Sequence, residues 1–257
     1  MKRHSNVARN LLVLPAVLAI SVVWPLEVYA LPTKTSSPFC TNLAATVAKV
    51  NGQMASLQAK LTSARTTRDN QLAANQSKWD SALEAARSKA DAARQSNFAQ
   101  LESKATTSAQ KSAVQTYEAA VMSAVATRRA ANDQARTTFR SALLGLLGAH
   151  RGQVDTQATA FSTAVKSAED SATAACQATP AEGASIRATF QAAMKTARQT
   201  YITSRQEDSK LGSQIAQLAH TRDEAIKAND TAFLAATKSA REALKAAFAS
   251  SATSPAQ

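Results

Sequence analysis

The stretch LAATVAKVNGQMASLQAKL, residues 43–61, decides the fold class. Its bulky apolar residues recur at alternating steps of four and three, at Leu43, Val47, Val50, Met54, Leu57 and Leu61. This spacing lines them up along one side of a helix and forms the a/d seam of a coiled coil. Most of the residues between them are small or polar. We therefore expect a long helix that packs on its neighbours through one narrow apolar seam.

The same spacing recurs further along the chain, and two stretches of helix-breaking residues divide it into arms. One interruption is the Ser/Thr-rich stretch at residues 104–110, and the other is Thr179-Pro180-Ala181-Glu182-Gly183. Proline disfavours helix in the residue before it, and Ser and Thr favour turns and caps. The breaks leave arms of about 39–104, 109–176 and 184–250, each about 100 Å long as a helix. Three similar arms predict an all-α fold over residues 39–251, a long antiparallel three-helix coiled coil running up, down and up, with a disordered tail at 252–257.

Composition supports a helical fold with little bulk in its core. The 257 residues include only 6 Gly and 6 Pro, and aromatic residues make up 5%. All-β and α/β folds need many more turn residues. Of the residues after position 30, 55 are Ala, which is the best helix former and buries little apolar area. An alanine-rich core also favours self-association, which we expect as one way to bury more surface.

Residues 1–30 resemble a secretory signal. Lys2, Arg3 and Arg9 precede an apolar run over residues 11–24, and Val28 and Ala30 supply small residues for a cleavage site after Ala30. Residues 31–38 then form a short linker. An alternative is an uncleaved membrane anchor, although the apolar run is shorter than the about 20 residues that a spanning helix needs. We expect export to the periplasm, the cell surface or the exterior, or else an N-terminally anchored protein.

Cys40 and Cys176 are the two cysteines of the chain, and in an exported protein they predict a disulfide. Their midpoint is residue 108, inside the Ser/Thr-rich break. A helical hairpin folded there brings the two cysteines to the same level, so two independent features agree. The alternative is a pair of unlinked thiols.

Glycines mark a candidate hinge. Gly145, Gly148 and Gly152 fall in the middle of the second arm, and each lowers helix stability relative to Ala. Gly212 lies at the corresponding level of the third arm. The first seam lapses at residues 65–71, so all three arms are expected to weaken at one level.

No catalytic or metal-binding motif stands out, and we expect neither an enzyme nor a small-molecule substrate or cofactor. The chain has no phosphate-binding glycine loop, no GxSxG and no HExxH. The adjacent carboxylates Glu169-Asp170 point about 100° apart on a helix and so form no shared acid/base site. The stretch Leu143–Ala149 is the most apolar after the signal, which keeps a membrane-active helical protein among the alternatives.

Positive charge is the main functional clue. The chain has 30 Lys and Arg against 18 Asp and Glu, a net charge of +12. Steps of seven and four place Arg129, Arg136 and Arg140 on one side of a helix, a candidate anion-binding face. The partners would be polysaccharide, lipid head groups or DNA; charge that serves only solubility is the alternative. The leading hypothesis is an exported, non-enzymatic structural or interaction protein, a basic helical rod of the cell envelope or exterior. The second is a binding module for anionic polymers or for protein clients, as in holdases.

Overall fold

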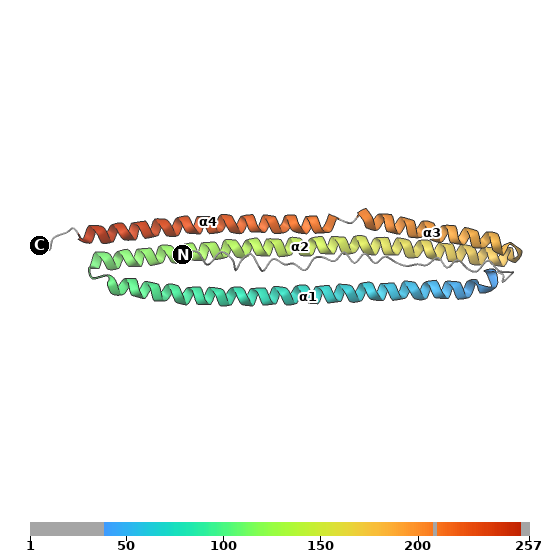
Figure 1. Cartoon of the computed structure of the whole chain (residues 1–257), viewed down its shortest axis with the longest axis horizontal. Helices are drawn as coiled ribbons and strands as arrows, with labels where there is room; N and C mark the ends of the chain where they lie inside the picture. The colour runs from blue at the N-terminus through green and yellow to red at the C-terminus, as the bar shows by residue number, and fades with distance from the viewer. Residues whose placement is uncertain (1–38, 208–209, 253–257) are drawn as a thin grey trace. The chain divides into compact units, whose positions relative to one another are not determined.

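The computed structural model describes residues 39–207 and 210–252, and this part of the chain is helical without a strand (Figure 1). The helices are α1 (Phe39–Lys104), α2 (Ser108–Ala178), α3 (Gly183–Glu207) and α4 (Leu211–Ala252), with a short 3-10 turn η1 (Pro180–Glu182) between α2 and α3. The all-α prediction is confirmed. The predicted signal and linker, residues 1–38, and residues 253–257 of the predicted tail lie outside the described residues.

The first turn has a sequence-encoded cap. The Thr107 hydroxyl accepts a hydrogen bond from the Gln110 amide at 3.2 Å, and the Gln110 side chain accepts one from the Thr107 amide at 3.3 Å. This is a capping box, which satisfies donors at the start of a helix that have no partner within the helix. It explains why α1 ends at Lys104 and α2 begins at Ser108, within the Ser/Thr-rich break.

The second turn is set by Pro180, which starts η1. The amide and the hydroxyl of Thr179 both donate to the Ala175 carbonyl oxygen, at 2.9 and 3.2 Å, and so close the end of α2. A side chain at Gly183 would lie 3.7 Å from the Phe39 amide nitrogen and 3.9 Å from the Cys40 sulfur. The turn therefore lies close to the start of α1, with room for ordinary van der Waals contact.

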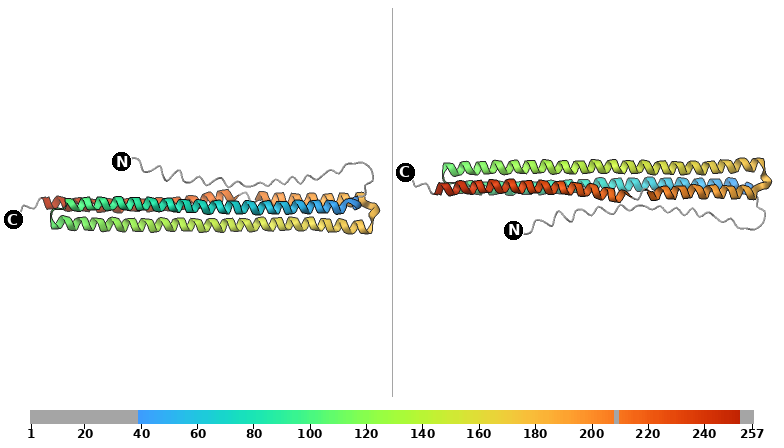
Figure 2. Two further views of the ribbon diagram at one scale, coloured as in Figure 1. Left: turned by 90° about the horizontal axis from the view of Figure 1, so that it is seen from below. Right: turned by 90° about the horizontal axis from the view of Figure 1, so that it is seen from above.

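The third arm is two helices and not one. α3 ends at Glu207 and α4 begins at Leu211, and the break is visible in both views of Figure 2.

The chain divides into two compact units. Unit 1 contains residues 39–57 and 145–216 of the described chain, and unit 2 contains residues 58–144 and 217–252. In unit 1, the seam residues Leu43, Val47, Val50 and Met54 of α1 pack against α2 and α3, in two clusters centred on Phe190 and Phe161. In unit 2, Phe98, Val121 and Val125 form a buried cluster, against which Tyr117 and Phe233 pack.

Candidate functional site

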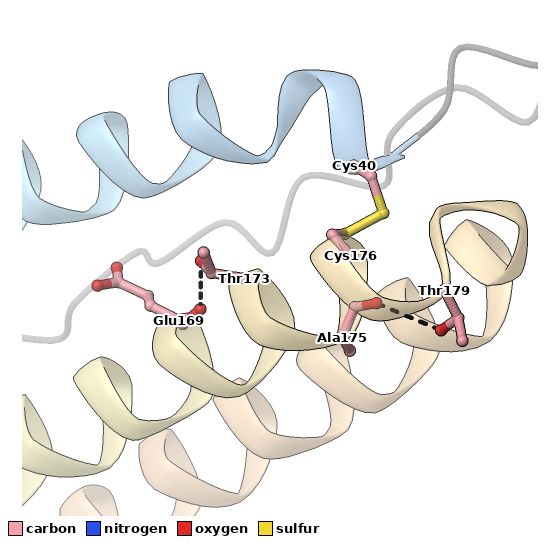
Figure 3. The surroundings of a disulfide bond; sticks show 6 residues. All are labelled: Cys40, Glu169, Thr173, Ala175, Cys176 and Thr179. Carbon is pink, nitrogen blue, oxygen red and sulfur yellow. Dashed lines mark hydrogen bonds between the residues drawn. A yellow bond between two sulfur atoms is a disulfide. The ribbon is translucent and has the colours of Figure 1, made fainter.

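A disulfide closes one end of unit 1. Cys40 at the start of α1 and Cys176 near the end of α2 are joined, with their Cα atoms 5.3 Å apart (Figure 3). The predicted pairing is confirmed. Directly beside it, Phe39 packs on Phe190 of α3 with ring centroids 5.9 Å apart. The bond therefore links α1 to α2 at the level where the first residue of α1 contacts α3.

A buried carboxyl lies two turns from the disulfide. Glu169 on α2 is 6% exposed, and Figure 3 shows it on the same helix as Cys176. Burial raises the pKa of Glu169, while a hydrogen bond from the Asn51 side chain acts in the opposite direction. Its Oε1 atom is buried without a hydrogen-bond partner in the described chain. Its neighbour Asp170 is exposed and pairs with Lys166 at 2.9 Å, so the two carboxyls do point apart, as the sequence predicts.

A ladder of ion pairs joins α1 and α2 in unit 2. The Arg87 guanidinium donates to the Asp133 carboxylate at 2.5 Å, and Arg129 donates to both carboxylate oxygens of Asp91, at 2.8 and 3.0 Å. Arg140 donates to Asp80 at 3.0 Å. In each of these three pairs the two residue numbers add up to 220, as one antiparallel register requires. We call this set the arginine ladder.

The three arginines of the predicted anion-binding face all belong to this arrangement. Arg129 and Arg140 pair across to α1, and Arg136 pairs with Asp133 on its own helix at 3.0 Å. Their side chains are 28%, 32% and 16% exposed, respectively. The Arg140 hydrogen bond lowers the pKa of Asp80, and the Arg129 hydrogen bond lowers that of Asp91. Burial lowers the pKa of Arg136.

The structure thus brings the three predicted arginines together on the side of α2 that contacts α1. Sequence reasoning missed their aspartates on α1. The signal was present in the spacing: Asp80 and Asp91 are 11 residues apart, and so are Arg129 and Arg140. Equal spacing on two antiparallel helices places both pairs in one register.

Arginine side chains also lie over three aromatic residues of unit 2. Arg128 lies 4.2 Å above the ring centroid of Phe233, and Arg222 lies 4.5 Å above that of Phe139. Arg136 lies 5.5 Å from the ring centroid of Trp79. Cation–π contacts and the aliphatic stems of arginine both stabilise such stacks. These cations therefore pack against the core as well as carrying surface charge.

A polar contact between α2 and α4 was also missed. Asn132 is 8% exposed and accepts a hydrogen bond from the Asn229 side chain at 2.9 Å. Its own amide donates to Asp230 at 3.5 Å. A buried asparagine in a coiled-coil seam specifies the register of its partner helix. The sequence signal is Asn132 itself, a polar residue at a seam position.

The predicted hinge glycines are all helical. Gly145, Gly148 and Gly152 lie within α2, and Gly212 lies in the first turn of α4. At none of them would an added Cβ meet another atom within 4 Å. The division between the units falls between residues 144 and 145 of α2 and between 216 and 217 of α4. This division is next to Gly145 and four residues after Gly212. Hinge motion at these glycines stays a prediction.

Unit 1 also contains an open groove between α2 and α3. Its volume is about 690 Å³, and its walls come from residues 156–175 of α2 and 185–204 of α3. The floor includes Phe161, Ile186, Phe190 and Tyr201, and most of the wall residues are Ala, Ser or Thr. Sequence reasoning did not identify this groove, because most of its wall residues are Ala, Ser and Thr, which carry no periodic apolar signal.

Comparisons with known proteins give no assignment. The chain matches no protein-family model, and no curated protein or solved structure is significantly similar to it. Within residues 39–207 and 210–252, no three His, Cys, Asp or Glu side chains are grouped so as to hold a metal ion. None of the helices in that same part has the length and apolarity required to cross a membrane.

Proposed function

We propose that this chain is an exported, non-enzymatic structural protein of the cell envelope or exterior. Its described helices would be the body of a basic three-helix coiled coil, running up, down and up behind a cleaved signal over residues 1–30. The observation that carries the proposal is the disulfide between Cys40 and Cys176. Disulfides persist mainly in oxidising compartments, and both cysteines of the chain are used in this one bond.

The contacts of the helices support a structural role. Three kinds of contact hold helix against helix: an aromatic contact of Phe39 with Phe190, an ion pair of Arg129 with Asp91, and a hydrogen bond from Asn229 to Asn132. The only strongly buried carboxyl among the described residues, Glu169, lies beside Asn51. Because these side chains connect neighbouring helices, they stabilise helix packing that is otherwise made largely by alanine.

Fractionation of cells expressing the chain with a C-terminal tag tests this proposal. We expect the tagged protein outside the cytoplasm, beginning at Leu31, with both cysteines resistant to thiol labelling until the protein is reduced. A cytoplasmic protein with two labelled cysteines would contradict the proposal. Intact Met1 in the membrane fraction would support an anchored protein instead of a cleaved one.

A binding module for anionic polymers is the second candidate, because unit 2 has an excess of positive charge. Its sequence contains 18 Lys and Arg against 11 Asp and Glu. Asp80, Asp91 and Asp133 are engaged by arginines in the ladder, whereas Lys78 and Lys89 on α1 are exposed. Exposed lysines beside neutralised aspartates attract polyanions without sequence selectivity.

The two kinds of cation can be separated by substitution. We expect Lys78→Gln with Lys89→Gln to weaken binding to DNA or anionic polysaccharide at low salt and to reduce its salt dependence, with helicity unchanged. Arg129→Gln with Arg140→Gln serves as the matched comparison, because it removes the same charge from the ladder. If the arginine pair reduces binding more than the lysine pair while helicity is kept, the predicted arginine face is the binding surface. If no polyanion binds at low salt, the binding-module candidate fails and the structural role stands.

A further inference from the structure

Lysine and arginine occupy different places in this protein. Among residues 39–207 and 210–252, all twelve lysines are exposed, whereas thirteen of the fourteen arginines are half-buried. The arginine ladder shows what burial of a guanidinium serves: it pairs with a carboxylate of the neighbouring helix, as Arg129 does with Asp91. The exception is Arg241 on α4 of unit 2, which is exposed. Its guanidinium is therefore accessible to a partner outside the chain.

Arg241 belongs to a row of exposed residues along α4, which we call the α4 cation row. Steps of four and three residues connect its members, so they share one side of the helix. They are Lys227, Thr231, Leu234, Lys238, Arg241 and Lys245, and all six are exposed. A different side of α4 carries Phe233 and Ala240, which pack against the buried cluster of Phe98. The cation row is thus left uncovered by the helix packing of unit 2.

Three cations lie close together at the C-terminal end of this row. Lys238, Arg241 and Lys245 fall within seven residues of sequence, about 10 Å along the helix axis. Glu242 is the one carboxylate of residues 231–252, and it pairs with Lys238 at 3.8 Å. No carboxylate of the described chain forms an ion pair with Arg241 or Lys245. Two of the three positive charges are therefore not compensated within the protein.

We propose that the α4 cation row binds the phosphodiester backbone of nucleic acid without reading its sequence. The proposal rests on the binding-module candidate and gives that candidate a location and a ligand class. One strand of duplex DNA carries a phosphate about every 3.4 Å, so three phosphates occupy about the same length as the three cations. A guanidinium binds a phosphate through two parallel hydrogen bonds, and each lysine adds a solvated point charge.

The composition of the row favours nucleic acid over a lipid surface. Leu234, which is 64% exposed, is the only large apolar residue of the row. A helix that lies in a lipid interface needs a broad apolar face, which one leucine does not provide. The lysines of α1 in the same unit are sparser, since Lys78 and Lys89 are 11 residues apart, about 16 Å along the helix axis. They present fewer charges to the same length of polyanion.

Fluorescence anisotropy with a labelled DNA duplex tests the proposal on the full chain. We expect Arg241→Gln with Lys245→Gln to raise the dissociation constant at low salt at least about tenfold, and to reduce the slope of log affinity against log salt by about two. Lys78→Gln with Lys89→Gln is the matched control, because it removes the same charge from exposed positions of α1. It should raise the dissociation constant about threefold or less. Helical circular dichroism should be unchanged in both variants, and a duplex of unrelated sequence should bind equally well.

Protection of lysines from acylation locates the site without any substitution. With the duplex bound, Lys238 and Lys245 should react more slowly with an amine-acylating reagent, whereas Lys78 and Lys89 should react at nearly the same rate as in the free protein. Mass spectrometry of the labelled peptides measures both rates.

The outcomes separate this proposal from the candidate function on which it rests. Equal loss of affinity in the two variants, or equal protection of α1 and α4 lysines, would overturn the α4 site and leave the binding module in place. Binding of acidic polysaccharide or of anionic phospholipid vesicles, but not of the duplex, would also overturn it. If neither the duplex nor acidic polysaccharide binds at low salt, the binding-module candidate and the α4 site fail together.

Discussion

Units 1 and 2 hold similar alanine-rich helices together by different chemistry. Unit 1 uses a disulfide and stacked aromatic residues, with Phe39 on Phe190 and Phe161 on Tyr201. Unit 2 uses the arginine ladder and arginines stacked on Phe139 and Phe233. Alanine leaves space between helices, and the two units show two ways to fill it: with covalent and aromatic contacts, or with long charged side chains whose stems are apolar.

The largest effect is expected from breaking the disulfide. The bond closes a loop across 136 residues, which the chain-entropy model converts to about 4–5 kcal/mol, less if the reduced chain keeps its helices. Cys40→Ser with Cys176→Ser should therefore raise amide exchange over residues 39–57 and 157–204, and leave residues 80–140 close to their original rates. Reduced unmodified protein is the control and should behave in the same way. Equal loss of protection in both units would show that the disulfide stabilises more than unit 1.

The arginine ladder is expected to contribute less than the disulfide but more than surface ion pairs. Asp133→Asn leaves Arg87 and Arg136 without their shared carboxylate, and their side chains are 21% and 16% exposed. We expect a loss of about 1–2 kcal/mol in the free energy of unfolding. Asp170→Asn is the matched control, since its pair with Lys166 is largely solvent-exposed, and should cost less than about 0.5 kcal/mol. Urea unfolding of both variants measures the difference, and equal losses would contradict a special role for the ladder.

The first turn and the disulfide were predictable because they depend on local or covalent chemistry. Thr107 and Gln110 encode the first turn within four residues, and the midpoint of the two cysteines falls on it. The register of the ladder was not predictable in this way. Residues that face each other on two antiparallel helices have residue numbers with a constant sum, and for the two cysteines this sum is 216. If the same register held along the whole of α1 and α2, Asp80 would lie opposite Arg136 instead of Arg140. The observed pairs add up to 220, a difference of about one helical turn.

The alanines of the apolar seam do not fix such a shift. The interhelical packing energy changes little when one alanine replaces another across the seam, so long-range polar pairs decide the register. Asp133 illustrates the consequence: Arg136 lies three residues away on the same helix, whereas Arg87 of α1 joins this pair only in the folded protein. The groove of unit 1 was missed for a related reason, because Ala, Ser and Thr carry no periodic signal.

The two units should respond to acid in opposite directions. Arginines lower the pKa of Asp80 and Asp91, so these groups stabilise unit 2 above their unfolded pKa of 3.8, and that contribution is lost as the pH falls through the lowered values. Burial raises the pKa of Glu169, so its contribution to unit 1 is complete below 4.5 and is lost as the pH rises through the raised value.

Glu169→Gln isolates the contribution of unit 1. At pH 7 it removes a buried charge with one oxygen that lacks a partner, and we expect a gain of about 1 kcal/mol in the free energy of unfolding. Near pH 3, where Glu169 is protonated, the variant and the unmodified chain should differ little. Asp170→Asn serves again as the control, because its carboxyl is exposed and paired with Lys166. A variant that is destabilised at pH 7 would show that the Asn51 hydrogen bond outweighs burial.

The smallest effect is expected at the glycines of α2, where the chain passes from one unit to the other. Glycine in the middle of a helix is less stable than alanine by about 0.5–1 kcal/mol, because the unfolded chain loses more backbone freedom on folding. Nothing lies within 4 Å of a Cβ built at Gly148, so Gly148→Ala should recover that amount without steric strain. Amide exchange over residues 145–152 should slow by a factor of about 2–5, the ratio that this free energy gives at 25 °C, if these residues open locally. Ala149→Gly, one residue further on and also exposed, should have the reverse effect. If Gly148→Ala leaves local exchange unchanged while the global stability rises, residues 145–152 open only with the whole molecule, and the glycines are not a hinge.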